Sequence, residues 1–184
     1  MTLTRTPLLI AALLFASIAT QATHASEFAP LPIRTTPVPA TTSGVPHVQL
    51  GGESNPALIR ELMTRASRIP DVDIRDTVIS MPGATAFWIE EHVTLSNPQA
   101  IVGGREFAHM HPDGSLHASL SPSLAVKAVN GGWAIAHPWA NKRKGWEGFV
   151  MIYTPTTDRE VETVYQLVLA SFDFVTGQQL STFK

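Results

Sequence analysis

Residues 105–120 read Arg-Glu-Phe-Ala-His-Met-His-Pro-Asp-Gly-Ser-Leu-His-Ala-Ser-Leu, and they predict a β-hairpin at the centre of the fold. Its two halves have the alternating pattern of β-strands, and Pro112-Asp113-Gly114 between them has the composition of a turn. The small or apolar residues of both halves have even numbers, so they share one buried face only if the connecting loop has an odd number of residues. Pro112-Asp113-Gly114 provides such a loop, with glycine in the left-handed conformation at its last position. These even-numbered residues are Ala108, Met110, Leu116, Ala118 and Leu120.

This register places histidines of both strands on one face of the predicted hairpin. It pairs His109 with His117, and it turns His111 to the same side. Phe107 and Arg105 are expected on that face too, and Glu106 on the opposite face. A loop of two or four residues would instead move His117 to the opposite face and divide the cluster. The pairs that follow from the predicted loop are Ala108 with Ala118, His109 with His117, and Met110 with Leu116.

The histidine face has several chemical interpretations, which the residues leave open. Neutral imidazoles could hold a divalent metal ion. Without a metal, one imidazole could act as a base while Arg105 and another histidine stabilise an anion. The plainer alternative is a polar, solvated sheet face. His137 is a fourth candidate, whereas His24 and His47 fall in the N-terminal segments and are expected to play no part in the site.

The remaining pattern predicts an α+β fold, with helices packed on one face of a mostly antiparallel sheet. Helix start signals occur at Asn55-Pro56, at Ser121-Pro122 and at the capping box Thr157-Asp158-Arg159-Glu160. Gly131 and Gly177 follow the second and third helices as stop signals. Strands are expected at residues 73–80, 84–91, 103–111, 115–120, 133–137 and 149–153.

The N-terminal residues are predicted to be a targeting signal followed by a linker. Arg5, an apolar run over residues 8–19 and the small-residue site Thr23-His24-Ala25 are typical of a secretory signal peptide over residues 1–25. Export would place the protein in the periplasm of a bacterium or outside the cell, without a stable membrane anchor after cleavage. Residues 26–53 form a Pro/Thr-rich linker or strap that is expected to add little stability, and the folded domain spans residues 54–184.

The composition excludes several classes of function. Because the chain has no cysteine, it cannot form a disulfide, a cysteine-ligated metal centre or a thiol nucleophile. Its 13 basic and 15 acidic residues give a formal charge of −2, which argues against a nucleic-acid partner. A small-molecule ligand is therefore the expected partner.

Several motifs in order resemble those of the luciferase-domain family, over roughly residues 54–177. They are Arg105-Glu106-x-Ala108-His109-Met110-His111, Leu116-His117, Gly132-Trp133, His137-Pro138 and Tyr153-x-Pro155. For the fungal luciferases of that family, the resemblance implies oxidation of a hydroxylated styryl-pyrone by molecular oxygen, without flavin, nicotinamide or ATP. This chain departs from the fungal pattern because it carries an export signal rather than a membrane anchor. A similar site with a different substrate is therefore expected.

These observations give three hypotheses for function. The first is a cofactor-independent, oxygenase-like enzyme acting on a small aromatic or enolisable substrate, with catalytic residues His109, His111, His117, His137 and Arg105. His109 or His117 would be the base and Arg105 would hold the anion. Phe107, Trp133 and Trp139 would cover the substrate ring. The alternatives are an exported, non-catalytic module that binds a small molecule or a metal, and a structural envelope protein. No organic cofactor is predicted, and a divalent metal at the histidine cluster stays open.

Overall fold

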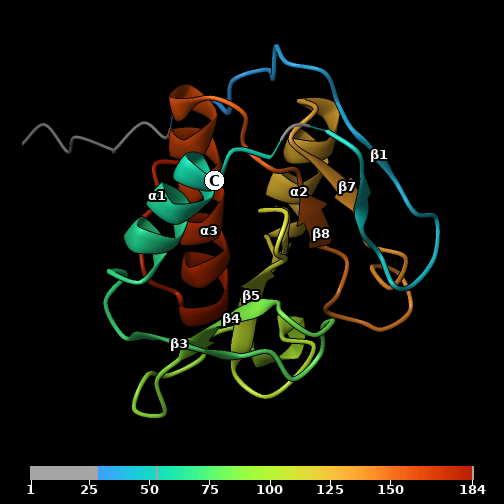
Figure 1. The fold of residues 1–184 in the computed structure, drawn as a ribbon. Helices are drawn as coiled ribbons and strands as arrows, with labels where there is room; N and C mark the ends of the chain where they lie inside the picture. The colour runs from blue at the N-terminus through green and yellow to red at the C-terminus, as the bar shows by residue number, and fades with distance from the viewer. Residues whose placement is uncertain (1–28, 53, 184) are drawn as a thin grey trace, which may run out of the picture.

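The computed structural model describes residues 29–52 and 54–183, so the predicted signal peptide lies outside the described residues. Its fold is α+β, as expected, and the main sheet is antiparallel throughout (Figure 1). The strand order in this sheet is β3-β4-β5-β6-β8-β7. Its strands are β3 (Val72–Asp76), β4 (Thr85–Ile89), β5 (Glu106–Met110), β6 (Leu116–Ser119), β7 (Ala134–Ala136) and β8 (Phe149–Ile152).

The hairpin β5–β6 has the predicted register. His109 lies opposite His117, Ala108 opposite Ala118, and Met110 opposite Leu116. The amide of His111 donates to the carbonyl of Ser115 over 2.8 Å, which closes the loop over residues 112–114. Gly114 has a φ of +88°, the left-handed conformation that this loop requires at its last position.

All three helices begin where the capping residues predict, and the second and third end at the predicted glycine stop signals. They are α1 (Pro56–Ala66), α2 (Pro122–Asn130) and α3 (Asp158–Thr176), and a short 3₁₀ turn, η1 (Pro98–Ala100), precedes β5. The side chains of Asn55, Ser121 and Thr157 each accept a hydrogen bond from an amide in the first turn of the helix that follows. Gly177 ends α3 with a φ of +82°. Within the described residues, none of the helices combines the length and the apolar character that crossing a bilayer requires.

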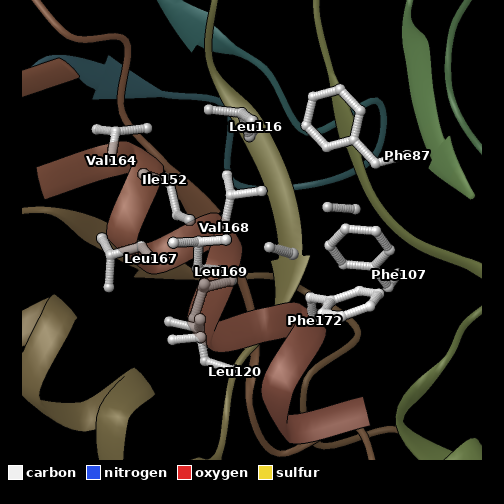
Figure 2. Packing of buried hydrophobic residues seen from close by; sticks show 14 of the residues in the cluster. Phe87, Phe107, Leu116, Leu120, Ile152, Val164, Leu167, Val168, Leu169 and Phe172 are labelled. Atoms are coloured by element: carbon white, nitrogen blue, oxygen red, sulfur yellow. The ribbon is translucent and has the colours of Figure 1, made fainter. Parts of the chain in front are cut away.

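The hydrophobic core lies between the helices and one face of the sheet. The even-numbered residues of the hairpin belong to it, and α3 packs across β5 and β6. Figure 2 shows Phe87, Phe107 and Phe172 close together at one end of this core, and the ring centroid of Phe107 lies 5.5 Å from that of Phe172 in an edge-to-face contact. The helices therefore cover one sheet face and leave the histidine face for another segment.

That segment is the N-terminal strap (residues 29–52), which wraps around the domain and includes the short strands β1 (Ala40–Thr41) and β2 (Gln49–Leu50) (Figure 1). The guanidinium of Arg34 lies 3.1 Å from the carboxylate of Glu160 in α3, and both side chains are buried. The indole N–H of Trp133 donates to the carbonyl of Pro32. These contacts disagree with the expectation that the segment adds little stability, because a linker without buried contacts would not hold an ion pair inside the protein.

Candidate functional site

The histidines of the hairpin are buried, so the interpretation as a solvated sheet face is wrong. His109 is 2% exposed, and His111 and His117 are each 4% exposed. Together with His47 and His137 they line a cavity of about 320 Å³. The prediction that His109, His111 and His117 face one cavity is confirmed. Both faces of this hairpin are covered, by α3 on one side and by the strap on the other.

His137 and His47 complete the cluster from other parts of the chain. His137 follows β7, and its ring centroid lies 4.7 Å from that of His117 and 5.0 Å from that of His47. The sequence-based dismissal of His47 is wrong. This residue sits in the strap, where no periodic pattern links it to the hairpin, so only the long-range path of the chain brings it to the site.

A β-bulge changes the faces of the residues that precede Ala108. In the pairing of β4 with β5, Phe87 lies opposite Ala108, but the next residue, Trp88, lies opposite Glu106, so that one residue of β5 is skipped. The extra residue, Phe107, stays in the helix-side core, where it contacts Phe87 and Phe172. One additional residue reverses the alternation of everything before it. The faces predicted for Arg105, Phe107 and Glu106 are therefore wrong.

Glu106 is the acidic partner of the histidine cluster, although the sequence pattern placed this residue on the opposite face of the hairpin. Its Oε1 atom lies 2.7 Å from Nδ1 of His109. The carboxylate also accepts hydrogen bonds from the hydroxyl of Thr77 and from the amide of Val78, both at 2.9 Å. The sequence signal that could have indicated this bulge is Gly103-Gly104, two residues before Glu106, because glycine within a strand often marks a bulge.

Arg105 does not line the cavity. Its guanidinium donates to the backbone carbonyls of Ile89, Glu90 and Val93, with distances of 2.9, 2.8 and 2.6 Å. The side chain thus fastens β4 and the loop after it to the start of β5. The predicted role of Arg105 as an anion-binding group has no geometric support.

Of the two tryptophans predicted to cover the substrate ring, Trp139 lines the cavity and Trp133 does not. Trp133 is in the hydrophobic core, where Arg34 of the strap lies over its ring at 5.5 Å. Trp139 lines the cavity, 5.2 Å from the ring of His137. The rest of the cavity lining is mostly apolar and consists of Val45, Pro46, Val48, Ile79, Ser80, Met81 and Phe149.

The hydrogen bonds of the cluster form a chain whose direction follows from its acidic end. Because the carboxylate of Glu106 accepts, Nδ1 of His109 carries a proton and its Nε2 atom is an acceptor. Nε2 of His109 lies 2.9 Å from Nδ1 of His117, and Nε2 of His117 lies 3.2 Å from Nδ1 of His47. With every ring neutral, His47 therefore donates to His117, His117 to His109, and His109 to Glu106. We call this chain the histidine relay (His47, His117, His109 and Glu106).

Hydrogen bonds also assign the protons of the two histidines outside the relay. The hydroxyl of Ser115 donates to Asp113 over 2.8 Å, so the contact of 3.0 Å between Ser115 and Nδ1 of His111 requires a proton on that nitrogen. Nε2 of His111 then has a free lone pair. In His137, Nδ1 accepts the amide proton of Trp139 over 3.0 Å, so the neutral ring carries its proton on Nε2. His111 is an acceptor toward a ligand, and His137 is a donor.

The cluster favours uncharged imidazoles. Burial, and next the positive charge that His109 would carry, lower the pKa of His111 to about 4. Burial and the neighbouring His47 lower the pKa of His137 to about 3. Burial also moves the pKa of His117 far below its ordinary value, with the surrounding histidines adding to the effect. Burial lowers the pKa of His47 as well. At neutral pH these rings are free to act as acceptors, donors or metal ligands.

The same geometry can hold a metal ion. Potential ligand atoms of His109, His111 and His117 all lie within 4.8 Å of one another, and so do those of His47, His117 and His137. Both groups are buried and both are within the cavity. A metal that binds imidazole nitrogen is therefore compatible with the site.

The comparisons with known proteins agree with the motifs. Residues 104–171 match the luciferase-domain family model. The match confirms the resemblance to the luciferase domain over a shorter stretch than the motifs suggested. It runs from Gly104, two residues before the bulged strand β5, to the second half of α3, and includes His109, His111, His117 and His137. No curated protein and no solved structure matches the chain. His47 lies outside the matched stretch.

Proposed function

We propose that the protein is an enzyme that removes a proton from a small enolisable or phenolic substrate and presents the resulting anion to molecular oxygen. The observation that carries this proposal is the histidine relay, which links His47 in the cavity to the buried carboxylate of Glu106. The luciferase-domain match supports oxygen as the second substrate.

His47 is the proposed base. Its Nδ1 atom is engaged with His117, so Nε2 is the nitrogen left to accept a proton from a ligand in the cavity. Burial lowers the pKa of His47, so a charged ring is unfavourable at this position. The relay lets His47 pass a proton to His117 instead of keeping the charge. As His47 gains a proton on Nε2, each relay member can pass its own proton onward, and the positive charge is neutralised at Glu106.

His137 is the proposed group that stabilises the substrate anion, the role predicted for Arg105. Because the amide of Trp139 donates to its Nδ1 atom, neutral His137 presents an N–H donor at Nε2. The rings of His47 and His137 lie 5.0 Å apart at nearly a right angle. A substrate in the cavity that contacts both rings meets a proton acceptor and a proton donor at the same time, which is the arrangement that favours enolisation.

The proposed reaction balances without another reductant. A C–H or O–H bond of the substrate breaks, the proton moves to His47, and the electron pair stays on the substrate. The anion then gives two electrons to molecular oxygen as a C–O bond forms, and the proton returns to complete a hydroperoxide. Substrate and oxygen thus combine one to one, and the relay returns to its starting state.

The cavity lining supports a flat, amphipathic substrate. Trp139 and Phe149 lie beside His137 at the polar end, and an aromatic ring packs well against such side chains. Val45 and Met81, which also line the cavity, are 53% and 38% exposed. They form an apolar entrance to a polar interior, which suits a small aromatic molecule that carries an acidic hydroxyl or enol.

The test uses a panel of 1,3-dicarbonyl compounds and hydroxylated aromatics with the purified protein. Proton removal is followed by NMR as deuterium uptake from D₂O, and oxidation is followed as oxygen consumption. We expect His47→Gln and His137→Gln to lower the rate by about 100-fold or more, in line with loss of a general acid or base. His92→Gln, at a side chain that is 66% exposed, is the matched control and should leave the rate unchanged. Equal rates for His47→Gln and the wild type would overturn the proposal.

A second function has a specific observation in its favour. An imidazole with a pKa of about 3 or 4 is a weak base at neutral pH, and His111 and His137 are in this range. A non-catalytic module that binds a small molecule or a metal through neutral imidazoles is compatible with such groups. Binding of panel compounds without deuterium uptake or oxygen consumption would favour this function over the enzyme.

We also propose that the protein acts after export, in the periplasm or outside the cell. The apolar run at residues 8–19 and the cleavage site Thr23-His24-Ala25 support this location. N-terminal sequencing of protein recovered outside the cytoplasm should begin near Ser26. Recovery of the chain with Met1 intact would contradict cleavage.

A further inference from the structure

We infer that His109, His111 and His117 bind a divalent first-row transition-metal ion, through Nε2 of His109, Nε2 of His111 and Nδ1 of His117. This inference goes beyond the proposed function, because metal binding requires neither a substrate nor a reaction. It rests on the placement of these rings and on what their other nitrogen atoms contact.

The three rings are held on rigid backbone at the right spacing. His109 and His117 are directly paired across β5 and β6, and His111 follows two residues after His109 on the same face. Nε2 of His109 and Nδ1 of His117 lie 2.9 Å apart. Two imidazole nitrogens about 2.1 Å from a tetrahedral ion are separated by about 3.4 Å, so a small side-chain adjustment admits the ion between them.

Each proposed ligand has a partner on its other nitrogen atom. Nδ1 of His109 contacts Glu106 at 2.7 Å, and Nδ1 of His111 contacts Ser115 at 3.0 Å, which is itself bound to Asp113. Nε2 of His117 contacts Nδ1 of His47 at 3.2 Å. Metal-binding histidines typically have such partners, which fix the ring and keep the coordinating nitrogen deprotonated.

The alternative group of His47, His117 and His137 fits a metal less well. Nδ1 of His137 accepts the amide proton of Trp139, so the neutral ring has its proton on Nε2 and no lone pair there for a metal. By contrast, the hydroxyl of Ser115 donates to Asp113 and accepts the proton on Nδ1 of His111. Nε2 of neutral His111 therefore has a free lone pair. The metal is therefore assigned to the group that contains His111.

The metal would take the place of the proton between His109 and His117. Nε2 of His117 would then carry the proton and donate it to Nδ1 of His47, so this hydrogen bond reverses, while the ion replaces the hydrogen bond between His117 and His109. The proton of His47 would then be on Nε2, so the relay and its proposed base operate only in the metal-free protein. Three protein ligands leave a coordination position on the cavity side, as in catalytic rather than structural zinc sites.

The experiment measures binding of Zn²⁺ and Co²⁺ to the full chain, purified without a polyhistidine tag and freed of metal with a chelator. We expect one tight site by calorimetry, and the visible absorption of Co²⁺ should report nitrogen ligands in a low-symmetry site. His111→Ala should weaken binding at least 100-fold. Ser115→Ala, which keeps all three ligands, should weaken it about 10-fold through loss of the partner of His111.

Two matched variants complete the design. His137→Ala removes a cavity histidine that is not a proposed ligand, so it should retain the wild-type affinity within about threefold. His92→Ala tests a separate, exposed group formed with Asp71 and Glu90, and should leave the tight site unchanged. Wild-type affinity in a folded His111→Ala variant would overturn the inference. Loss of binding in His137→Ala alone, or in His92→Ala alone, would also overturn it.

The outcomes separate this inference from the proposed function. His111 is not part of the relay, and His47 is not a proposed ligand. Deuterium uptake by a protein that binds no metal would overturn the inference and leave the proposed function in place. Tight metal binding, with no turnover by the metal-free protein, would do the reverse.

Discussion

At the scale of single residues, Glu106 determines the proton positions of the whole cluster. In Glu106→Gln, the amide group can still accept from Thr77 or Val78, but its nitrogen cannot accept the proton of His109. We expect His109 to move its proton to Nε2, which forces His117 to reverse as well. The buried side chain also loses a charge-assisted hydrogen bond, so the free energy of unfolding should fall by about 1–3 kcal/mol.

Imidazole ¹⁵N NMR measures the proton positions, and urea unfolding measures the free energy. Glu91→Gln is the control, since its side chain is 80% exposed and should change neither quantity. Unchanged protonation of His109 in Glu106→Gln would show that the carboxylate does not set the direction of the relay.

At the scale of secondary-structure elements, the hairpin loop sets the register that aligns the histidines. Gly114 has a φ of +88°, and a Cβ atom there would lie 2.7 Å from Cγ1 of Ile59 in α1. Gly114→Ala should therefore lower the free energy of unfolding by about 1–3 kcal/mol, through backbone strain and the clash with α1. Gly44→Ala is the matched control, because its Cβ meets nothing within 4 Å, and we expect a change within about 0.5 kcal/mol. Equal stabilities in urea for the two variants would contradict this account of the loop.

The same elements show which parts of the site the sequence could predict. The facing of His109 and His117 depended on local features, namely the alternation of the two strands and the length of the loop between them. The bulge at Phe107 depends on how β5 pairs with β4, which local alternation does not report. The contribution of His47 depends on the path of the strap, so the relay could be predicted only in its central part.

At the scale of the whole molecule, the histidine cluster makes stability depend on pH. The pKa values of His111 and His137 are about 4 and about 3 in the folded protein, against an ordinary value of 6.5. Below about pH 6.5 the unfolded chain therefore binds more protons than the folded one, and the free energy of unfolding falls as pH falls. The loss from these two rings is complete only below their folded pKa values.

We expect the urea midpoint of the metal-free protein to decrease steadily from pH 7 to pH 4, and the double variant His111→Gln/His137→Gln to decrease less steeply. Parallel slopes for the two proteins would mean that other groups cause the acid sensitivity.

The contacts of the strap with the rest of the protein indicate that the cooperative folding unit begins before residue 54. It buries Arg34 against Glu160 of α3 and supplies the carbonyl of Pro32 to the indole of Trp133. A chain that begins at Ser54 would leave Glu160 without its cation, and breaking a buried ion pair costs about 3–5 kcal/mol. It would also lose His47 and with it the end of the relay. We therefore expect the truncated chain to melt at a clearly lower temperature, or without cooperativity, in calorimetry.

His47→Ala in the full chain is the matched control for this truncation, because it removes the relay end but keeps Arg34 and Pro32. Its melting temperature should lie closer to that of the wild type than to that of the truncated chain. A truncated chain with an unchanged, cooperative transition would mean that residues 54–183 carry the whole stability. In that case the strap would serve only to deliver His47 and the apolar entrance of the cavity. A lower transition would instead mean that the same segment completes the hydrophobic core and the site, so that neither can form without the other.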